Sequence, residues 1–178
     1  GGGNLLMNGT NILRDTAVPT RLSVNALTHV TPWGNPISAG TTTINQSNSY
    51  TGGTVLNSGS LVINHSNALG TGVVDIYGTL QYGSGQLVAL AGSGGQTNIV
   101  RPVTHPNSTL IIDNTGALNT NRFGDGETLA LNGATFDYRG RNLPGGNTTE
   151  FITNAVYAGN SRILLTSFAS QTNALVIS

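Results

Sequence analysis

The fold of this chain is decided by residues 40–82, which read GTTTINQSNSYTGGTVLNSGSLVINHSNALGTGVVDIYGTLQY. The apolar runs in this stretch are short, as in Leu61-Val62-Ile63 and Val73-Val74-Asp75-Ile76. Turn-forming residues interrupt them, for example at Gly52-Gly53 and Ser58-Gly59. Short apolar runs bounded by turn residues predict short β-strands.

The same pattern extends over the rest of the chain. Further short apolar runs are Leu5-Leu6-Met7, Leu87-Val88-Ala89-Leu90, Leu110-Ile111-Ile112, Leu129-Ala130-Leu131, Ile163-Leu164-Leu165 and Leu175-Val176-Ile177. No window sustains the i, i+3, i+4, i+7 spacing of an amphipathic helix. The 25 Gly residues, together with abundant Asn and Thr, also disfavour helices. We therefore expect an all-β protein.

Internal similarity indicates a repeat with variable spacing. The triplet Asn-Ala-Leu occurs at 25–27, 67–69 and 173–175. A β-solenoid tolerates unequal spacings, because its insertions fall in corner loops. We interpret residues 1–178 as a single β-solenoid segment of short strands with variable corner loops. Because the chain begins Gly1-Gly2-Gly3-Asn4, we further interpret it as a mature or excised piece.

Charge and cysteine content exclude several classes of partner and site. Charged residues make up 8% of the chain and the net charge is zero, whereas an average globular protein has about 25% charged residues. A neutral chain lacks the basic surface that nucleic acid or an anionic membrane attracts. The absence of Cys excludes disulfides and thiolate metal sites. No apolar run approaches the length of a membrane-spanning helix.

Residues 40–82 also carry three motifs in a defined order. They are Tyr50-Thr51-Gly52-Gly53-Thr54, Ser58-Gly59-Ser60-Leu61 and Ala68-Leu69-Gly70-Thr71-Gly72. In this order and at these spacings they resemble the autotransporter-associated β-strand repeat, also called the passenger-associated transport repeat. Residues 110–178 resemble a second, degenerate repeat region of such proteins. Residues 1–39 and 83–109 match poorly.

The resemblance implies a right-handed parallel β-helix. It also implies export across the outer membrane of a bacterium and display at the cell surface, outside the cell. Asn8, Asn45, Asn64, Asn107 and Asn147 each begin an Asn-x-Ser/Thr sequon. We discount them as glycosylation sites because the resemblance is to bacterial proteins.

Candidate catalytic and metal-binding side chains are few. Asp113, Asp125 and Asp137 lie at intervals of twelve, and paired carboxylates serve hydrolases or calcium sites. Asp is more common simply as a turn residue, and we favour that interpretation. The three His residues, His29, His65 and His105, lack the spacing of a zinc site. We predict no catalytic residue, no metal site and no cofactor.

Aromatic and Arg residues are candidates for ligand contact. Trp33 lies in a loop between Pro32 and Pro36, which makes it the best candidate for an exposed contact with a sugar. We expect most of the Tyr side chains to lie inside the solenoid instead. Arg139-Gly140-Arg141 could bind an acidic glycan, but such a pair more commonly solvates a corner.

The functional expectation is structural. A β-solenoid ends in open strand edges, which can pair with further strands. Leu175, Val176 and Ile177 form the candidate self-assembly strand, either end to end with another copy or with the continuation of a longer chain. The alternative is an adhesin that binds glycans or surfaces through loops such as that of Trp33. A polysaccharide-degrading enzyme is a third hypothesis based on fold analogy alone, and the few carboxylates and missing Lys weigh against it.

Overall fold

The computed structural model describes residues 4–9, 11–25, 40–65, 68–82, 102–115, 128–140, 148–167 and 173–178. Every regular element within these residues is a β-strand. Every pairing between the strands is parallel. The predicted all-β class is confirmed.

Most strands belong to two long sheets. Sheet 1 consists, in spatial order, of β1 (Leu5–Met7), β3 (Thr41–Ile44), β5 (Ser60–Ile63), β7 (Thr79–Tyr82), β9 (Thr109–Asp113), β11 (Thr135–Arg139) and β14 (Arg162–Thr166). Sheet 2 consists of β2 (Leu22–Asn25), β4 (Thr54–Ser58), β6 (Val74–Ile76), β8 (Pro102–Thr104), β10 (Thr128–Asn132) and β13 (Asn154–Ala158). Sheet 3 contains β12 (Thr148–Ile152) and β15 (Asn173–Ile177).

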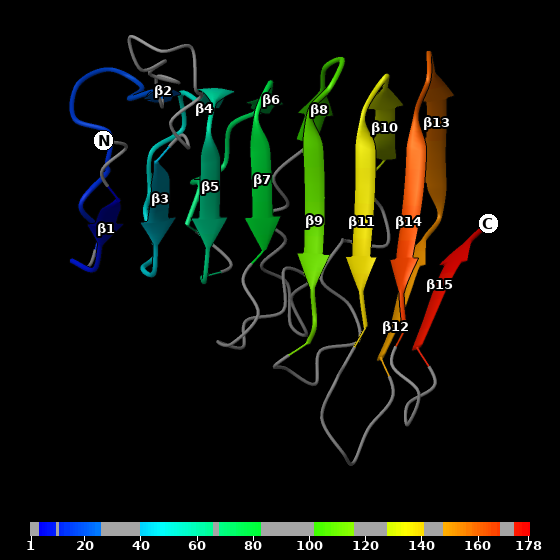
Figure 1. The fold of residues 1–178 in the computed structure, drawn as a ribbon. Helices are drawn as coiled ribbons and strands as arrows, with labels where there is room; N and C mark the ends of the chain where they lie inside the picture. The colour runs from blue at the N-terminus through cyan, green and yellow to red at the C-terminus, as the bar shows by residue number, and fades with distance from the viewer. Residues whose placement is uncertain are drawn as a thin grey trace, which may run out of the picture.

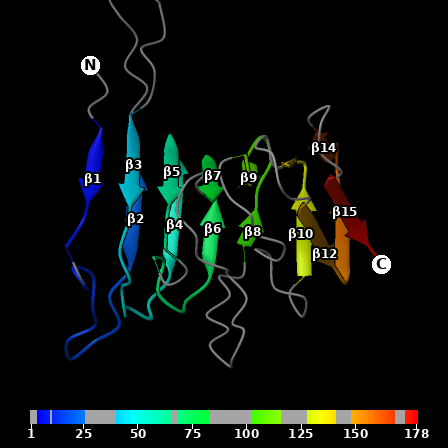
Figure 2. The ribbon, with the colours of Figure 1, turned by 90° about the horizontal axis from the view of Figure 1, so that it is seen from below.

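The chain winds from one sheet to the other and back. From β1 to β11, consecutive strands belong alternately to sheets 1 and 2, so each coil adds one strand to each sheet. In Figure 1 the strands of sheet 1 stand side by side from β1 on the left to β14 on the right. Figure 2 shows sheet 2 beside sheet 1 along the same axis. The protein is therefore a β-solenoid, as the sequence predicts, and its right-handed winding stays a prediction.

A third side joins each strand of sheet 1 to the following strand of sheet 2. In the first coils this side is irregular, with a single parallel bridge between Arg14 and Ser49. Backbone hydrogen bonds from Ser49 N to Leu13 O (3.1 Å) and from Thr71 N to Tyr50 O (3.2 Å) hold it together. In the last two coils β12 and β15 occupy this side. Within the described residues, paired strands occupy the third side in the last two coils.

The core consists of apolar side chains stacked from coil to coil. Leu61 pairs in register with Leu80, Leu80 with Leu110, and Leu110 with Phe136. All four side chains are fully buried. Each stacked side chain removes apolar surface from water, at about 25 cal/mol per Å². Because every coil covers the one before it, the core is continuous along the solenoid.

The corners from β4 to β5 and from β10 to β11 are tight turns. Gly59 has φ +80 between β4 and β5, and Gly133 has φ +64 between β10 and β11. Residues with a side chain rarely adopt this left-handed backbone conformation, whereas Gly does so freely. The turn signals Ser58-Gly59 and Asn132-Gly133 therefore mark solenoid corners.

The Gly residues of the sequence motifs lie where adjacent coils approach closely. A Cβ on Gly72 would lie 2.5 Å from the Cα of Gly53 and 2.7 Å from the carbonyl oxygen of Thr51. A Cβ on Gly70 would overlap the carbonyl oxygen of Tyr50. The motif at 68–72 thus stacks directly on the motif at 50–54 of the preceding coil.

Asn side chains form a ladder after the strands of sheet 1. Asn45 Nδ2 donates a hydrogen bond to Asn8 Oδ1, and Asn64 Nδ2 donates one to Asn45 Oδ1, each at 2.7 Å. The first pair is separated by 37 residues and the second by 19. The ladder therefore keeps its spatial register although the coils differ greatly in length. Three of the five sequon Asn side chains are engaged in it.

Candidate interaction surfaces

The C-terminal end of the solenoid presents three strand edges. Within the described residues, β13 pairs only with β10, β14 only with β11, and β15 only with β12. Each of the three strands is five residues long. A row of edge N–H and C=O groups is a template for pairing with another strand. This end therefore has the geometry of an unfinished coil.

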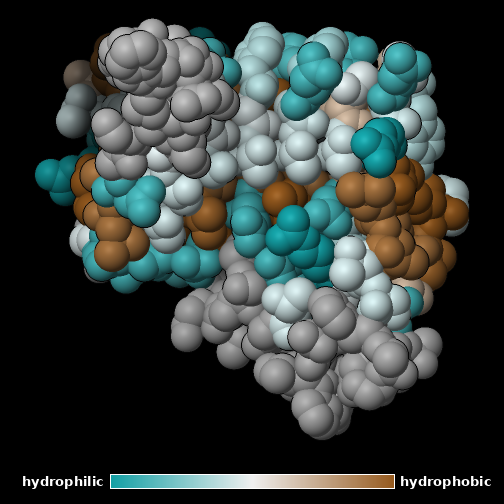
Figure 3. All heavy atoms as spheres, in the orientation of Figure 1, coloured by the Kyte–Doolittle hydropathy of each residue, from teal (hydrophilic) through white to brown (hydrophobic). Residues whose placement is uncertain are grey.

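The inward side chains of this last coil are exposed to solvent. Ile163 and Leu165 continue the rows of Phe136 and Tyr138. Phe136 and Tyr138 are fully buried, whereas Ile163 is 37% and Leu165 51% exposed. Figure 3 shows a hydrophobic patch at this end, where β14 lies. The exposure has a simple cause, since no described coil stacks on them.

The predicted self-assembly strand is part of this end. Leu175, Val176 and Ile177 lie in β15, and Leu175 packs partly against the core. Sequence reasoning did not identify β13 and β14 as the two companion edges. The signal for β14 was present in the apolar run 163–165, but that run looks like the buried apolar runs of the chain. Only the spatial order of the strands in each sheet shows which of the described strands lie at the end of the stack.

The opposite end is formed by β1 and β2. Each of them pairs with a single strand, β3 and β4 respectively. Leu5 is 55% and Leu6 57% exposed. Strand β1 has three residues and β2 has four. This end is thus also open in the described residues, but its edges are shorter than those at the C-terminal end.

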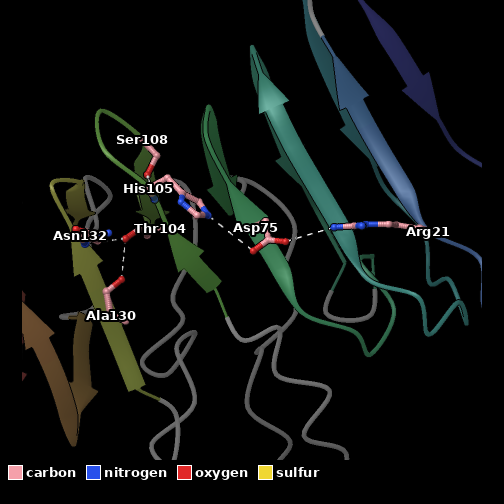
Figure 4. Close-up of polar contacts among 7 residues, drawn as sticks. All are labelled: Arg21, Asp75, Thr104, His105, Ser108, Ala130 and Asn132. Carbon is pink, nitrogen blue, oxygen red and sulfur yellow. Dashed lines mark hydrogen bonds and ion pairs between the residues drawn. The ribbon is translucent and has the colours of Figure 1, made fainter.

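The outer face of sheet 2 carries a polar cluster that extends over several coils (Figure 4). The carboxylate of Asp75 lies 3.4 Å from Arg21 Nη2 on one side and 3.8 Å from His105 Nε2 on the other. The rings of His105 and Tyr77 stack with centroids 3.8 Å apart at 7°. Tyr77 is 48% exposed. The cluster therefore presents an aromatic pair beside charged groups.

The neighbouring polar groups in Figure 4 are used in backbone pairing. The hydroxyl of Thr104 donates to the carbonyl oxygen of Ala130 at 2.7 Å and accepts from the N–H of Asn132 at 3.1 Å. The Ser108 hydroxyl accepts a hydrogen bond from the N–H of His105 at 3.2 Å. These contacts hold β8 against β10, and they fix the backbone that carries His105.

Two of the three evenly spaced carboxylates meet on the outer face of sheet 1. Arg139 contacts Asp137 Oδ2 at 2.8 Å and Asp113 Oδ2 at 3.6 Å. Gln81 Nε2 donates to the same Asp113 oxygen at 3.1 Å. Both carboxylates are thus held by an Arg, which makes this a structural ion-pair cluster. Asp125 lies outside the described residues.

The prediction that these Asp residues occupy turns is partly correct. Asp113 Oδ1 accepts hydrogen bonds from the N–H and hydroxyl of Thr115, at 3.0 and 2.6 Å, as in an Asx turn. For Asp137 the prediction is wrong, because this residue lies in the middle of β11. Alternation along the strand places it between the core residues Phe136 and Tyr138, on the outer face.

Tyr50 is a titratable group of the core whose pKa is shifted. Its side chain is fully buried and its hydroxyl lies 2.5 Å from the Thr54 hydroxyl. Burial raises the pKa of Tyr50 to about 12, although the hydrogen bond with Thr54 opposes the shift. Tyr50 and Tyr138 thus lie inside the solenoid, whereas Tyr77 and Tyr157 are exposed. The expectation that most Tyr side chains are inside therefore holds for two of the four whose burial is described.

Several candidate residues lie outside the described part of the chain, namely Trp33, His29, Arg141 and Asn147. Among the residues that the structure describes, no group of three or more His, Asp or Glu side chains could hold a metal ion. Within the same residues no helix is long and apolar enough to cross a membrane.

Comparisons with known proteins gave no match: no family model, no curated protein and no solved structure is similar enough to report. The resemblance of residues 40–82 to the autotransporter-associated repeat stays a prediction.

Proposed function

We propose that this chain is an extracellular structural protein, a stalk or filament component of the bacterial cell surface that assembles through its open strand ends. The observation that carries the proposal is that both ends are open within the described residues, where parallel edges and exposed core side chains occur together. The surface location rests on the resemblance of residues 40–82. Catalysis forms no part of the proposal.

The physical basis is the repetitive nature of coil stacking. Each coil makes the same parallel pairing with the coil before it and offers the same pairing to the next. Adding a coil to an open end buries side chains such as Leu165 and satisfies edge N–H and C=O groups. An assembly joined in this way extends along the solenoid axis, which is the geometry of a stalk or filament.

Sedimentation velocity over a concentration series tests this proposal. We expect the sedimentation coefficient to rise with concentration, because the open ends associate. A single monomeric species at all concentrations up to about 1 mM, a weak-binding limit, would contradict assembly by this chain.

A second candidate function is supported by the outer face of sheet 2. Tyr77, stacked on His105 beside Asp75 and Arg21, is the kind of exposed aromatic and charged cluster that an adhesin uses to bind glycans. Binding to a glycan panel that is lost in Tyr77→Ala and kept in Val73→Ala would favour this function. Val73 is an equally exposed neighbour without a ring.

A further inference from the structure

We propose that the outer face of sheet 1 binds a neutral oligosaccharide, which lies across the strands along a row of Thr and Ser hydroxyl groups. The site is centred on β7, β9 and β11, away from the strands at either end of the sheet. It depends neither on assembly through open strand edges nor on the Tyr77 cluster of sheet 2. A row of unused hydroxyls, an unpaired carboxylate oxygen and a negative net charge define it.

The hydroxyl row occupies the same position in five neighbouring strands of sheet 1. Register pairs each member with the next along the sheet, in the order Thr41, Ser60, Thr79, Thr109 and Thr135. The following residues of β5, β7 and β9 are the buried Leu61, Leu80 and Leu110. By alternation the hydroxyl row therefore faces outward. Four strand spacings make the row about 19 Å long.

The fold does not use these hydroxyl groups. All five residues are partly exposed. Within the described part of the chain, none of their hydroxyls takes part in a hydrogen bond. The hydroxyl of Thr104, in contrast, donates to the carbonyl oxygen of Ala130. Because a hydroxyl both donates and accepts, the row offers a sugar chain a two-way hydrogen-bonding partner at every strand.

An apolar centre lies beside the row. Ile111 is the next outward residue of β9 after Thr109, and it is 6% exposed. Gln81 of β7 and Asp137 of β11 flank it in register. Figure 3 shows a small hydrophobic area enclosed by hydrophilic residues near the middle of this face. A sugar suits such a surface, because its ring carries C–H groups on its faces and hydroxyls at its edge, and ligand sites combine apolar surface with a few placed polar groups.

One carboxylate oxygen at this centre lacks a donor. Oδ2 of Asp137 lies 2.8 Å from Arg139 Nη2. Oδ1 of the same carboxylate is buried and, among the described residues, has no hydrogen-bond partner. An unpaired buried acceptor costs free energy. Because the χ2 torsion of Asp is broad, a small rotation presents Oδ1 to the outer face while Oδ2 stays near Arg139. A sugar hydroxyl that donates to Oδ1 removes the cost.

The charges of the cluster select against acidic ligands. Asp113 and Asp137 carry two formal negative charges and Arg139 one positive charge, which leaves an excess of one negative charge. The guanidinium of Arg139 is already engaged by both carboxylates, at 2.8 and 3.6 Å. A carboxylate on a ligand would meet this excess, and like charges at an interface are unfavourable. The acidic glycan considered for Arg139 from the sequence therefore fits less well than a neutral one.

The row also sets the direction of the ligand. Its hydroxyls follow one another along the solenoid axis, because each belongs to the next strand of sheet 1. An extended sugar chain along this axis meets a new hydroxyl about every 4.8 Å. Affinity should therefore increase with chain length until the ligand spans the row, and then stay constant.

An array of linear neutral and acidic oligosaccharides, graded from disaccharide to hexasaccharide, tests the inference with the full chain. We expect binding to neutral members that tightens with length, and weaker binding to uronic-acid chains of the same length. No binding to any neutral member at millimolar concentration would overturn the inference. A preference for the acidic chains would overturn it as well.

Variants of the hydroxyl row locate the binding. Thr109→Val and Thr135→Val remove hydroxyls that no described residue uses, and they keep the β-branched shape that suits a strand. Each should lower the affinity about two- to tenfold, the value of one hydrogen bond, and the double variant should lower it further. Thr128→Val is the matched control, because Thr128 is an exposed strand residue on the outer face of sheet 2. It should bind like the unmodified chain.

The outcomes separate this site from the functions proposed above. Unchanged affinity in the double variant, or an equal loss in Thr128→Val, would show that the row is not the binding surface. Loss of binding in Tyr77→Ala with full binding in the double variant would assign the sugar to sheet 2 instead. Sedimentation of the double variant should match that of the unmodified chain, because the open strand edges are untouched, so a failure of assembly and a failure of sugar binding are told apart.

Discussion

At the scale of single residues, the solenoid depends on a few positions where successive coils pack closely. Tyr50 fills the interior beside the third side, and its hydroxyl is bonded to Thr54. Gly72 allows the backbone of one coil to approach that of the preceding coil. Both belong to the motif stretch 40–82, which explains physically why that stretch decides the fold.

Tyr50 predicts a loss of stability at alkaline pH. Its pKa is about 12 in the folded chain, above the value of about 10 for an exposed Tyr. The folded state therefore retains the phenol proton longer than the unfolded state, and this contribution is complete below pH 10. It decreases as the pH rises from 10 through about 12. Urea denaturation between pH 9 and 12 measures it.

Tyr50→Phe is the control for this profile. The variant keeps the ring but has no ionisable hydroxyl, so its free energy of unfolding should fall less steeply with pH over the same window. Parallel profiles for the two proteins would contradict the assignment to Tyr50.

The close approach of the backbone at Gly72 predicts that a larger residue there destabilises the fold. Gly72→Ala places a methyl group against the backbone of Gly53 and Thr51, and overpacking of this kind costs about 1 to 3 kcal/mol. In the control Gly9→Ala the new methyl group meets only the side chain of Ile12, which is half exposed and can move. Thermal unfolding should show a clear decrease in Tm for Gly72→Ala alone. Equal Tm values for the two variants would show that the coil containing Gly72 can move away from the preceding coil without a loss of stability.

At the scale of elements, the Asn ladder connects successive coils. Among the described residues, the Asn45 side chain bonds to both Asn8 and Asn64, whereas the Asn8 side chain bonds only to Asn45. Each such hydrogen bond contributes about 0.5 to 1.5 kcal/mol. Asn45→Ala should therefore destabilise the chain about twice as much as Asn8→Ala, as measured by urea denaturation. Equal losses of stability in the two variants would mean that only one of the two Asn45 hydrogen bonds contributes to the free energy of unfolding.

The strands themselves could be predicted from the sequence, because their apolar runs are short and bounded by turn residues. Leu61–Ile63 falls in β5, Leu110–Ile112 in β9 and Leu129–Leu131 in β10. The pairing could not be predicted, since one coil separates its Asn residues by 37 positions and the next by 19. A register between coils of unequal length depends on where the insertions fall, and no local pattern specifies that.

The candidate site was predictable only in part for the same reason. Leu175–Ile177 was correctly placed in a strand, but an edge is a property of the winding and not of a run of residues. The run at 163–165 consists of Ile and Leu residues alone, as does the buried run at 110–112. What distinguishes them is that, within the described residues, a further coil stacks on the run at 110–112 and none stacks on the run at 163–165. Likewise, a local pattern does not show that Asp137 lies in a strand. The alternation of side chains along β11 places it on the outer face.

At the scale of the whole molecule, the solenoid is a one-dimensional stack in which each coil contacts mainly its neighbours. Its interior ends where stacking ends, and core side chains such as Leu165 are exposed there. The account therefore locates the function at the ends of the stack. The outer face of sheet 2 remains the place for a second, ligand-binding role.

Electron microscopy of the purified chain at increasing concentration tests this central claim most directly. The account predicts rods that are longer than one solenoid and keep its width. Rods of a single solenoid length at every concentration would contradict it, because the open ends would then have no tendency to pair.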